Sequence, residues 1–145
     1  MINKADLKQI ATTRLAESRI LFQKKHRKYE GAVHLCVCAV EMAFKKKICD
    51  VLHWKEFPET RSEFEKGFVS FKTHNPQILL RLSGEELKIK KNTEAWANWS
   101  ILLDLMEKDI FNIEIRYKPK GRVTKEQAKE IIKATDILLK FLGIK

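Results

Sequence analysis

The stretch YEGAVHLCVCAVEMAFKKKICDVLHW, residues 29–54, decides the fold of this chain. Its apolar side chains fall on more than one side of a helix, which is typical of a helix surrounded by other helices. Phe57-Pro58 follows, and proline both lacks a backbone donor and restricts the residue before it. The sequence therefore predicts a central helix over residues 29–54 that ends before Phe57-Pro58.

Amphipathic segments flank this central helix on both sides. In residues 3–25 the apolar side chains recur at spacings of three and four, as one face of a helix requires. Residues 92–108 repeat the pattern, and Asn92 or Thr93 can cap the first turn. A final helix starts at the capping box formed by residues 124–127 and ends at Gly143. Four long helices are expected.

Shorter elements are expected between the second and third long helices. A short helix is expected over residues 61–66, and Asn75-Pro76 marks the start of another. Ser83 stands three residues before Glu86, the spacing of a further capping box. Residues 113–119 predict an extended connection. The chain is thus expected to be an all-α, up-and-down bundle of four long helices, forming one domain over residues 1–145.

Composition supports a folded chain with one core. Of 145 residues, 44% are hydrophobic and 33% charged, which excludes a disordered chain. Three cysteines inside apolar helical sequence are not the layout of a secreted disulfide scaffold. There is also no apolar run of about 18 residues and no signal-peptide core. We therefore expect a cytoplasmic protein.

The net charge is +10, from 29 basic and 19 acidic residues. Such an excess attracts polyanions such as RNA, or an acidic partner protein. The alternative is a basic surface that is simply solvated, and charge alone does not separate the two.

Residues 29–45 resemble the second helix of HEPN-domain proteins, a prokaryotic family of small helical bundles: a tyrosine-x-x-alanine start leads to alanine-valine-glutamate and then lysine. Further matches follow in the family's order. They are Phe71-Lys72-Thr73-His74 before Leu79-Leu80, the pair Trp96 and Trp99, and Arg116-Tyr117.

The resemblance implies a helical bundle, often a homodimer, that acts in toxin–antitoxin and other defence systems. Active members are metal-independent endoribonucleases whose motif is an arginine followed after four to six residues by a histidine. The resemblance also leaves open a structural role beside a nucleotidyltransferase in a two-gene system. A genomic neighbour of that kind would favour this role.

This chain departs from the family's motif, because no histidine follows Arg116. Cleavage of RNA through the 2′-hydroxyl needs a group that exchanges protons near neutral pH, as imidazole does. Arg19 with His26 and Arg27 with His34 have similar spacing, but they lie in the wrong part of the pattern. We therefore expect a non-catalytic protein that binds RNA, a nucleotide or a partner protein.

The alternative is an endoribonuclease that uses a re-sited proton-transfer group, either His74 or Tyr117. Under both hypotheses the resemblance points to Arg116, and basic residues cluster in the loop that follows it. The candidate ligand-binding residues are Arg116, Tyr117, Lys118, Lys120 and Arg122.

A polar stripe on the central helix is the second candidate feature. His34, Cys38, Glu41 and Lys45 are separated by four, three and four residues, so they lie along one side of the helix. One interpretation is a buried ion pair of Glu41 with Lys45, or with an arginine such as Arg14 or Arg116. The other is a polar groove or dimer seam that supports Arg116.

No cofactor is expected. His34 with Cys38 and Cys49 with His53 have the spacing of metal ligands, but along one helix the two pairs stand about 20 Å apart. Buried thiols are the simpler interpretation. Trp96 and Trp99 repeat at helical spacing and are expected to be core residues rather than stacking platforms.

Overall fold

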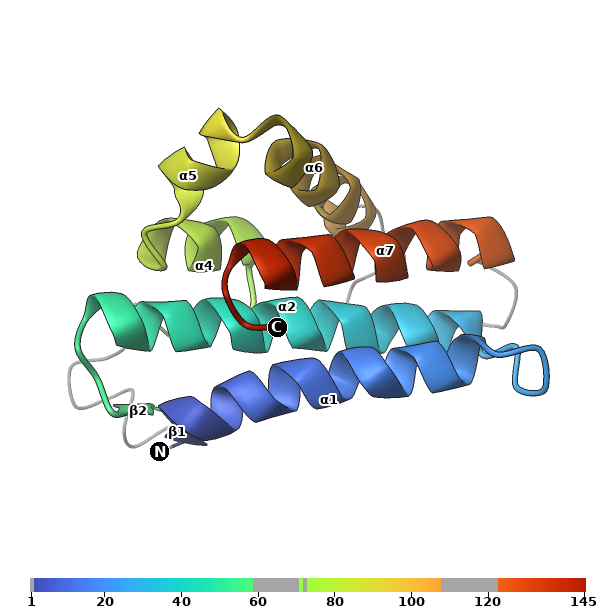
Figure 1. Cartoon of the computed structure of the whole chain (residues 1–145), viewed down its shortest axis with the longest axis horizontal. Helices are drawn as coiled ribbons and strands as arrows, with labels where there is room; N and C mark the ends of the chain where they lie inside the picture. The colour runs from blue at the N-terminus through green and yellow to red at the C-terminus, as the bar shows by residue number, and fades with distance from the viewer. Residues whose placement is uncertain (1, 59–70, 72, 108–122) are drawn as a thin grey trace.

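The computed structural model describes residues 2–58, 71, 73–107 and 123–145. This part of the chain is mostly helical, which confirms the predicted all-α class. Its helices are α1 (Lys4–Phe22), α2 (Tyr29–Val51), α4 (Pro76–Leu82), α5 (Glu86–Lys91), α6 (Thr93–Glu107) and α7 (Lys125–Phe141). The long helices α1, α2 and α7 lie side by side, and α4, α5 and α6 cover one side of them (Figure 1).

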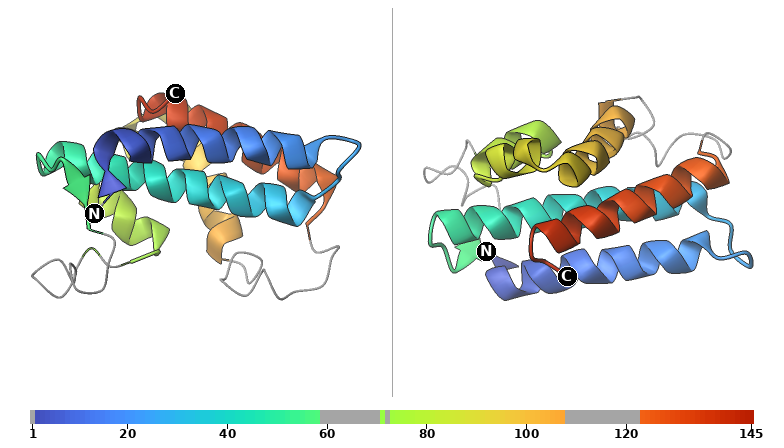
Figure 2. Two further views of the ribbon diagram at one scale, coloured as in Figure 1. Left: turned by 90° about the horizontal axis from the view of Figure 1, so that it is seen from below. Right: turned by 45° about the horizontal axis from the view of Figure 1, so that its top comes forward.

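The direction of each long helix can be followed in the figures. Helix α1 runs one way, and α2 and α7 run the opposite way (Figure 1). Helix α6 is steeply inclined to all three (Figure 2). The predicted up-and-down arrangement of four long helices is therefore not confirmed, because α6 crosses its neighbours instead of lying along them.

Helix α1 begins where the sequence predicts and ends earlier. The Asn3 side chain caps it by accepting a hydrogen bond from the backbone N–H of Ala5 at 2.7 Å. Its last residue is Phe22 rather than residue 25. The chain then turns through Arg27, whose φ is 50°, and the backbone N–H of Lys28 donates to the carbonyl of Leu21. This tight return sets the antiparallel packing of α1 against α2.

Helix α2 ends at Val51, so the prediction that it continues to residue 54 is wrong. His53 has a φ of 57°, and a residue in this left-handed region commonly ends a helix. The backbone N–H of Trp54 then donates to the Cys49 carbonyl at 2.8 Å. The helix thus stops through its own C-terminal turn, before the chain reaches Phe57-Pro58.

The structure contains a two-stranded sheet that the sequence does not predict. Strand β1 (Ile2–Asn3) and strand β2 (Glu56–Phe57) are antiparallel, with Ile2 opposite Phe57. Two residues are too short to produce a readable alternation. The pairing ties the start of α1 to the segment after α2.

The short helices follow local signals only in part. Asn75 caps α4 by accepting from the backbone N–H of Gln77 at 3.0 Å, and Pro76 takes the first helical position, as predicted. The capping box predicted at Ser83 is not formed. Glu85 is the N-cap of α5 without a side-chain bond, and Ser83 Oγ instead donates to the Leu80 carbonyl at 2.6 Å.

The last two helices begin as predicted. Asn92 Oδ1 accepts from the backbone N–H of Ala95 at 2.9 Å at the start of α6. Thr124 and Gln127 form the capping box of α7, each side chain accepting from the other's backbone N–H. Gly143 follows α7 with a φ of 72°, a conformation that favours glycine.

The core is centred on α2, and it includes one of the two tryptophans predicted there. Trp99 is fully buried and meets Phe44 edge-on, with ring centroids 5.4 Å apart. Trp96 is 41% exposed, so its assignment to the core was wrong. A helix has only one face toward the core, and Trp99 occupies that face of α6.

Two predicted elements, the short helix over residues 61–66 and the extended connection over residues 113–119, lie outside the described residues. Among the helices that the structure describes, none is both long enough and apolar enough to cross a membrane.

Candidate functional site

The polar stripe of α2 consists of two pairs of side chains, and the two members of each pair are one helical turn apart. The Cys38 Sγ atom lies 3.7 Å from His34 Nε2. Lys45 Nζ donates to Glu41 Oε1 at 2.6 Å, which is the ion pair that their spacing predicted. Arg14, the other described candidate for Glu41, instead pairs with Glu17 at 2.8 Å.

Glu41 has a second partner from far along the chain. His74 Nδ1 lies 2.8 Å from the same Glu41 oxygen that Lys45 contacts. The Glu41 side chain is 16% exposed, whereas the His74 side chain is 74% exposed. One nearly buried carboxylate therefore holds a lysine of its own helix and an imidazole that stands at the surface. We call these three side chains the Glu41 cluster.

Aromatic packing and a turn position the segment that carries His74. Trp54 meets Phe71 edge-on at a centroid distance of 4.9 Å and also contacts Phe57. The backbone N–H of Thr73 donates to the Phe71 carbonyl, and Thr73 Oγ1 accepts from the backbone N–H of Asn75. These contacts bring His74 toward α2 just before α4 begins.

Lys45 is also held by an aromatic ring. Its ammonium group lies 5.4 Å from the centroid of Phe57, within the range of a cation–π contact. Its side chain is only 14% exposed. A lysine fixed in this way neutralises Glu41 rather than reaching out to a ligand, so the surface chemistry of the cluster belongs to His74.

The cluster has the geometry of an oriented imidazole. When Glu41 is ionised, its oxygen accepts a hydrogen bond from Nδ1–H, and this contact assigns the tautomer of His74. Nε2 is then the ring nitrogen that is left to accept a proton. Such an arrangement can bind an anion in its charged form and transfer a proton in its neutral form.

The sequence indicates each residue of the Glu41 cluster, but it does not predict the contact between Glu41 and His74. Glu41 and Lys45 were found from helical spacing, and His74 was named only as a possible proton-transfer group. Glu41 and His74 are 33 residues apart, so no local pattern connects them. The remaining candidates, Arg116, Tyr117, Lys118, Lys120 and Arg122, lie outside the described residues.

Two of the three thiols on α2, those of Cys36 and Cys49, are not poised for nucleophilic chemistry. Burial raises the pKa of the Cys36 thiol, and Ser18 Oγ lies 3.1 Å from its sulfur. Burial, with a smaller effect of neighbouring Asp50, raises the pKa of Cys49 to about 11. Both are therefore protonated near neutral pH. No group of three or more potential metal-ligating side chains occurs within the described ranges.

The chain has no significant match among protein-family models, curated proteins or solved structures.

Proposed function

We propose that this chain is a HEPN-like helical protein that binds RNA, with the Glu41 cluster as part of its site. The Glu41–His74 contact carries the proposal, since it presents an oriented, exposed imidazole on a chain of net charge +10. A protonated imidazole donates to phosphate oxygens, and the excess positive charge attracts the RNA backbone. The sequence resemblance supports RNA over other polyanions. The residues expected to act with His74 are Arg116, Tyr117, Lys118, Lys120 and Arg122.

Affinity for a single-stranded RNA, measured against salt concentration, tests this proposal. Electrostatic binding weakens steeply as salt rises. His74→Ala is expected to weaken binding several-fold, because it removes the exposed imidazole that we propose contacts a phosphate. The matched control is His26→Ala, which removes an exposed histidine from the turn between α1 and α2. Equal affinities for both variants and the parent chain would reject a role for His74.

Arg116 is tested in the same assay. Arg116→Ala is expected to weaken RNA binding and to lower the salt dependence by about one counterion. Arg14→Ala is the control, because it removes an arginine whose partner on α1 is Glu17. An unchanged affinity for Arg116→Ala would exclude the basic site near that residue.

The Glu41–His74 contact also favours a second candidate function, metal-independent cleavage of RNA. In this reaction His74 Nε2 takes the proton of a 2′-hydroxyl, whose oxygen then attacks the adjacent phosphorus. The bond from phosphorus to the 5′-oxygen breaks, and the leaving oxygen takes a proton from water. The products are a 2′,3′-cyclic phosphate and a 5′-hydroxyl. A positioned general base of this kind accelerates a reaction by about 10²–10⁴-fold.

Incubation of end-labelled RNA with the protein in EDTA separates the two candidates. The cleavage hypothesis predicts products that disappear in His74→Ala and in Arg116→Ala but persist in His26→Ala. Intact RNA at every protein concentration would reject cleavage and leave binding as the function.

The resemblance also supports assembly, either as a homodimer or with a nucleotidyltransferase. We expect a two-chain species in a mass measurement of the purified protein. A mass of one chain at every concentration would argue against the homodimer.

A further inference from the structure

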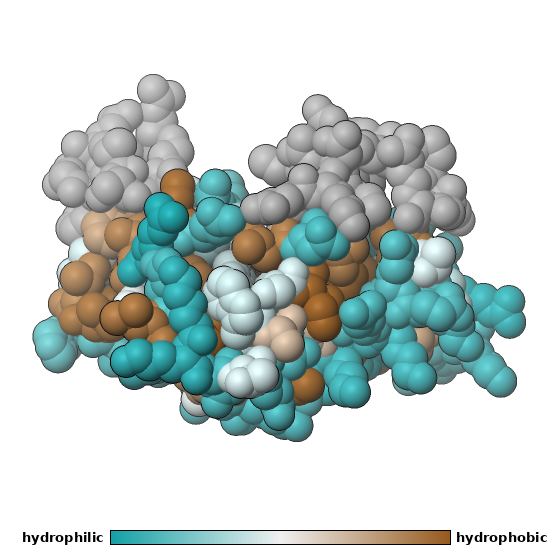
Figure 3. All heavy atoms as spheres, turned by 90° about the horizontal axis from the view of Figure 1, so that it is seen from above, coloured by the Kyte–Doolittle hydropathy of each residue, from teal (hydrophilic) through white to brown (hydrophobic). Residues whose placement is uncertain are grey.

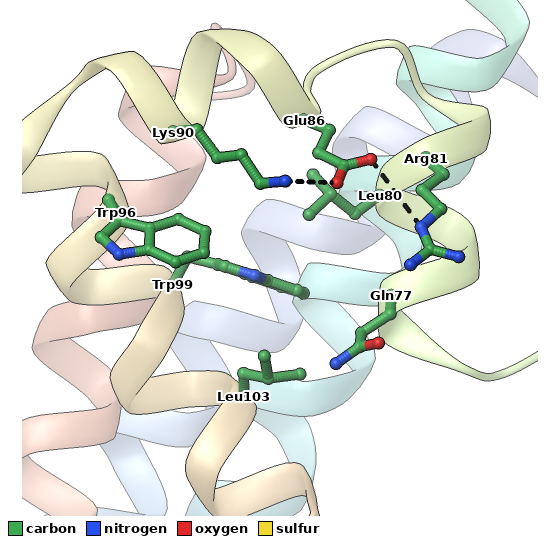
Figure 4. A pocket seen from close by; sticks show the side chains of 8 residues that line it. All are labelled: Gln77, Leu80, Arg81, Glu86, Lys90, Trp96, Trp99 and Leu103. Carbon is green, nitrogen blue, oxygen red and sulfur yellow. Dashed lines mark hydrogen bonds and ion pairs between the residues drawn. The ribbon is translucent and has the colours of Figure 1, made fainter.

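A cavity of about 180 Å³ opens among α4, α5 and α6, on the side of the molecule away from α1 (Figures 1 and 4). One part of its lining is apolar and comes from Leu80, Leu103 and the two indoles, Trp96 and Trp99. Figure 3 looks onto this side of the molecule, where hydrophobic patches lie beside hydrophilic ones. The cavity is separate from the Glu41 cluster and contains none of its residues.

The two tryptophans contribute differently to this cavity. Trp99 is buried and fixed edge-on against Phe44, so it forms a rigid wall. Trp96 lies one helical turn earlier and keeps 41% of its surface exposed. In Figure 4 its ring lies at the side of the cavity. An indole face in such a position can stack on another planar ring.

The other part of the lining is charged. Lys90 Nζ donates to Glu86 Oε1 at 2.9 Å, and Arg81 Nε lies 3.8 Å from the second oxygen of the same carboxylate (Figure 4). Two cations thus meet one carboxylate. Lys88 and Lys91 lie in the last turn of α5 but do not line the cavity, and the Lys88 ammonium group is 3.7 Å from Glu85 Oε1. The rim therefore favours an anionic group beside an apolar, aromatic pocket.

Size limits what the cavity can hold. Sites that enclose a whole small molecule usually measure about 300–1,000 Å³. At about 180 Å³ this cavity takes a single ring system and leaves the rest of the ligand outside, next to the charged rim. A planar base joined to a phosphate has this combination of properties, whereas an apolar side chain of a partner protein would not match the excess of two cations over one carboxylate in the lining.

We propose that this pocket takes one base of a single-stranded RNA, which stacks on Trp96 while the adjoining phosphate contacts Arg81 and Lys90. The inference deepens the proposed RNA binding by adding a base-binding subsite, and it rests on that function. One RNA strand can contact both the pocket and His74, because Gln77 of the pocket is three residues from His74. Three residues span at most about 11 Å of chain.

The test compares a short single-stranded RNA with an abasic oligoribonucleotide of the same length. Both carry the same phosphates, so electrostatic binding is retained and only the bases differ. Stacking of one base is expected to make the normal RNA bind about tenfold more tightly. Trp96→Leu should remove this difference while leaving affinity for the abasic strand unchanged. Leu87→Ala changes an exposed apolar residue of α5 that does not line the cavity, so it should preserve the difference.

Each result distinguishes failure of the pocket from failure of RNA binding. Equal, salt-dependent affinity for both strands would overturn the base-binding subsite and retain the proposed function. The subsite would also be overturned if Trp96→Leu kept its preference for the normal strand. Absence of binding to either strand would overturn both the subsite and the proposed function. Thermal unfolding of each variant checks the fold, and the abasic comparison in the parent chain needs no substitution.

Discussion

Two carboxylates of this molecule, Asp136 and Glu41, are buried to a similar degree but differ in the groups they hold. The Asp136 side chain is 14% exposed and the Glu41 side chain 16%. Asp136 contacts Arg19 of α1, Lys140 of α7 and Lys145 near the C-terminus. Glu41 contacts Lys45 of its own helix and the exposed imidazole of His74.

The difference indicates which cluster can perform chemistry. Each partner of Asp136 among the described residues is a permanent cation, and the pair with Arg19 ties α7 to α1. Burial alone would raise the pKa of Asp136, but hydrogen bonds from Lys140, Lys145 and Arg19 outweigh it and hold that pKa well below its usual range. Glu41 instead holds the imidazole of His74, a side chain that can both donate and accept a proton. Burial and charge pairing alone therefore do not identify a site.

The largest expected difference is in catalysis. If the chain cleaves RNA, Glu41→Gln should lower the cleavage rate by about 100-fold, because an amide neither stabilises the imidazolium nor fixes its tautomer. Asp136→Asn should change the rate by less than about twofold at a temperature where the protein stays folded. Initial rates on labelled RNA in EDTA measure both. Equal losses in the two variants would mean that Glu41 acts only through stability.

The second difference is in stability. Asp136→Asn should lower the free energy of unfolding by about 1–3 kcal/mol, since charged hydrogen bonds from two helices and the C-terminus are lost together. Glu17→Gln is the control, because Glu17 forms a single exposed ion pair with Arg14 and should cost under about 1 kcal/mol. Urea denaturation at pH 7 measures both variants. Similar values would show that Asp136 is no more than an ordinary surface pair.

A smaller effect is expected in acid. The pKa of Asp136 in the folded chain lies below its usual 3.8, so its stabilising contribution is complete above that value and is lost as pH falls below it. Between pH 5 and pH 2 the parent chain should therefore lose about 1–2 kcal/mol more stability than Asp136→Asn. Asp50, whose pKa is also lowered by hydrogen bonds from Lys46 and Lys4 despite its partial burial, titrates equally in both proteins. Parallel pH profiles would contradict the assignment.

Local signals in the sequence predicted much of the fold. The capping residues Asn75 and Thr124 and the left-handed Gly143 each act within a few residues, and the structure contains all three as expected. The end of α2 was missed because His53 takes the left-handed conformation after the helix, at a position where glycine or asparagine is the usual signal. Pro58 is the stronger signal for a helix end, but it lies beyond Val51, where α2 ends.

The site could be predicted only where it is local. Glu41 and Lys45 are one helical turn apart, and their ion pair follows from that spacing. The contact of Glu41 with His74 depends on how the segment before α4 packs on α2, which no sequence period reports. The two tryptophans show the same limit. Trp96 and Trp99 share one pattern, but Trp99 packs against Phe44 and is buried whereas Trp96 is exposed.

The smallest expected effect comes from removing one of the three cations that contact Asp136. Lys145→Ala removes one of three cations and leaves Arg19 and Lys140 on the carboxylate, at 2.9 Å and 2.8 Å. Because the two remaining partners still satisfy Asp136, the cost should be about 0.5 kcal/mol, well below that of Asp136→Asn. Urea denaturation of the two single variants and the double variant gives their coupling. If Lys145→Ala cost as much as Asp136→Asn, the C-terminal lysine, rather than the link between α1 and α7, would be the main source of the cluster's stability.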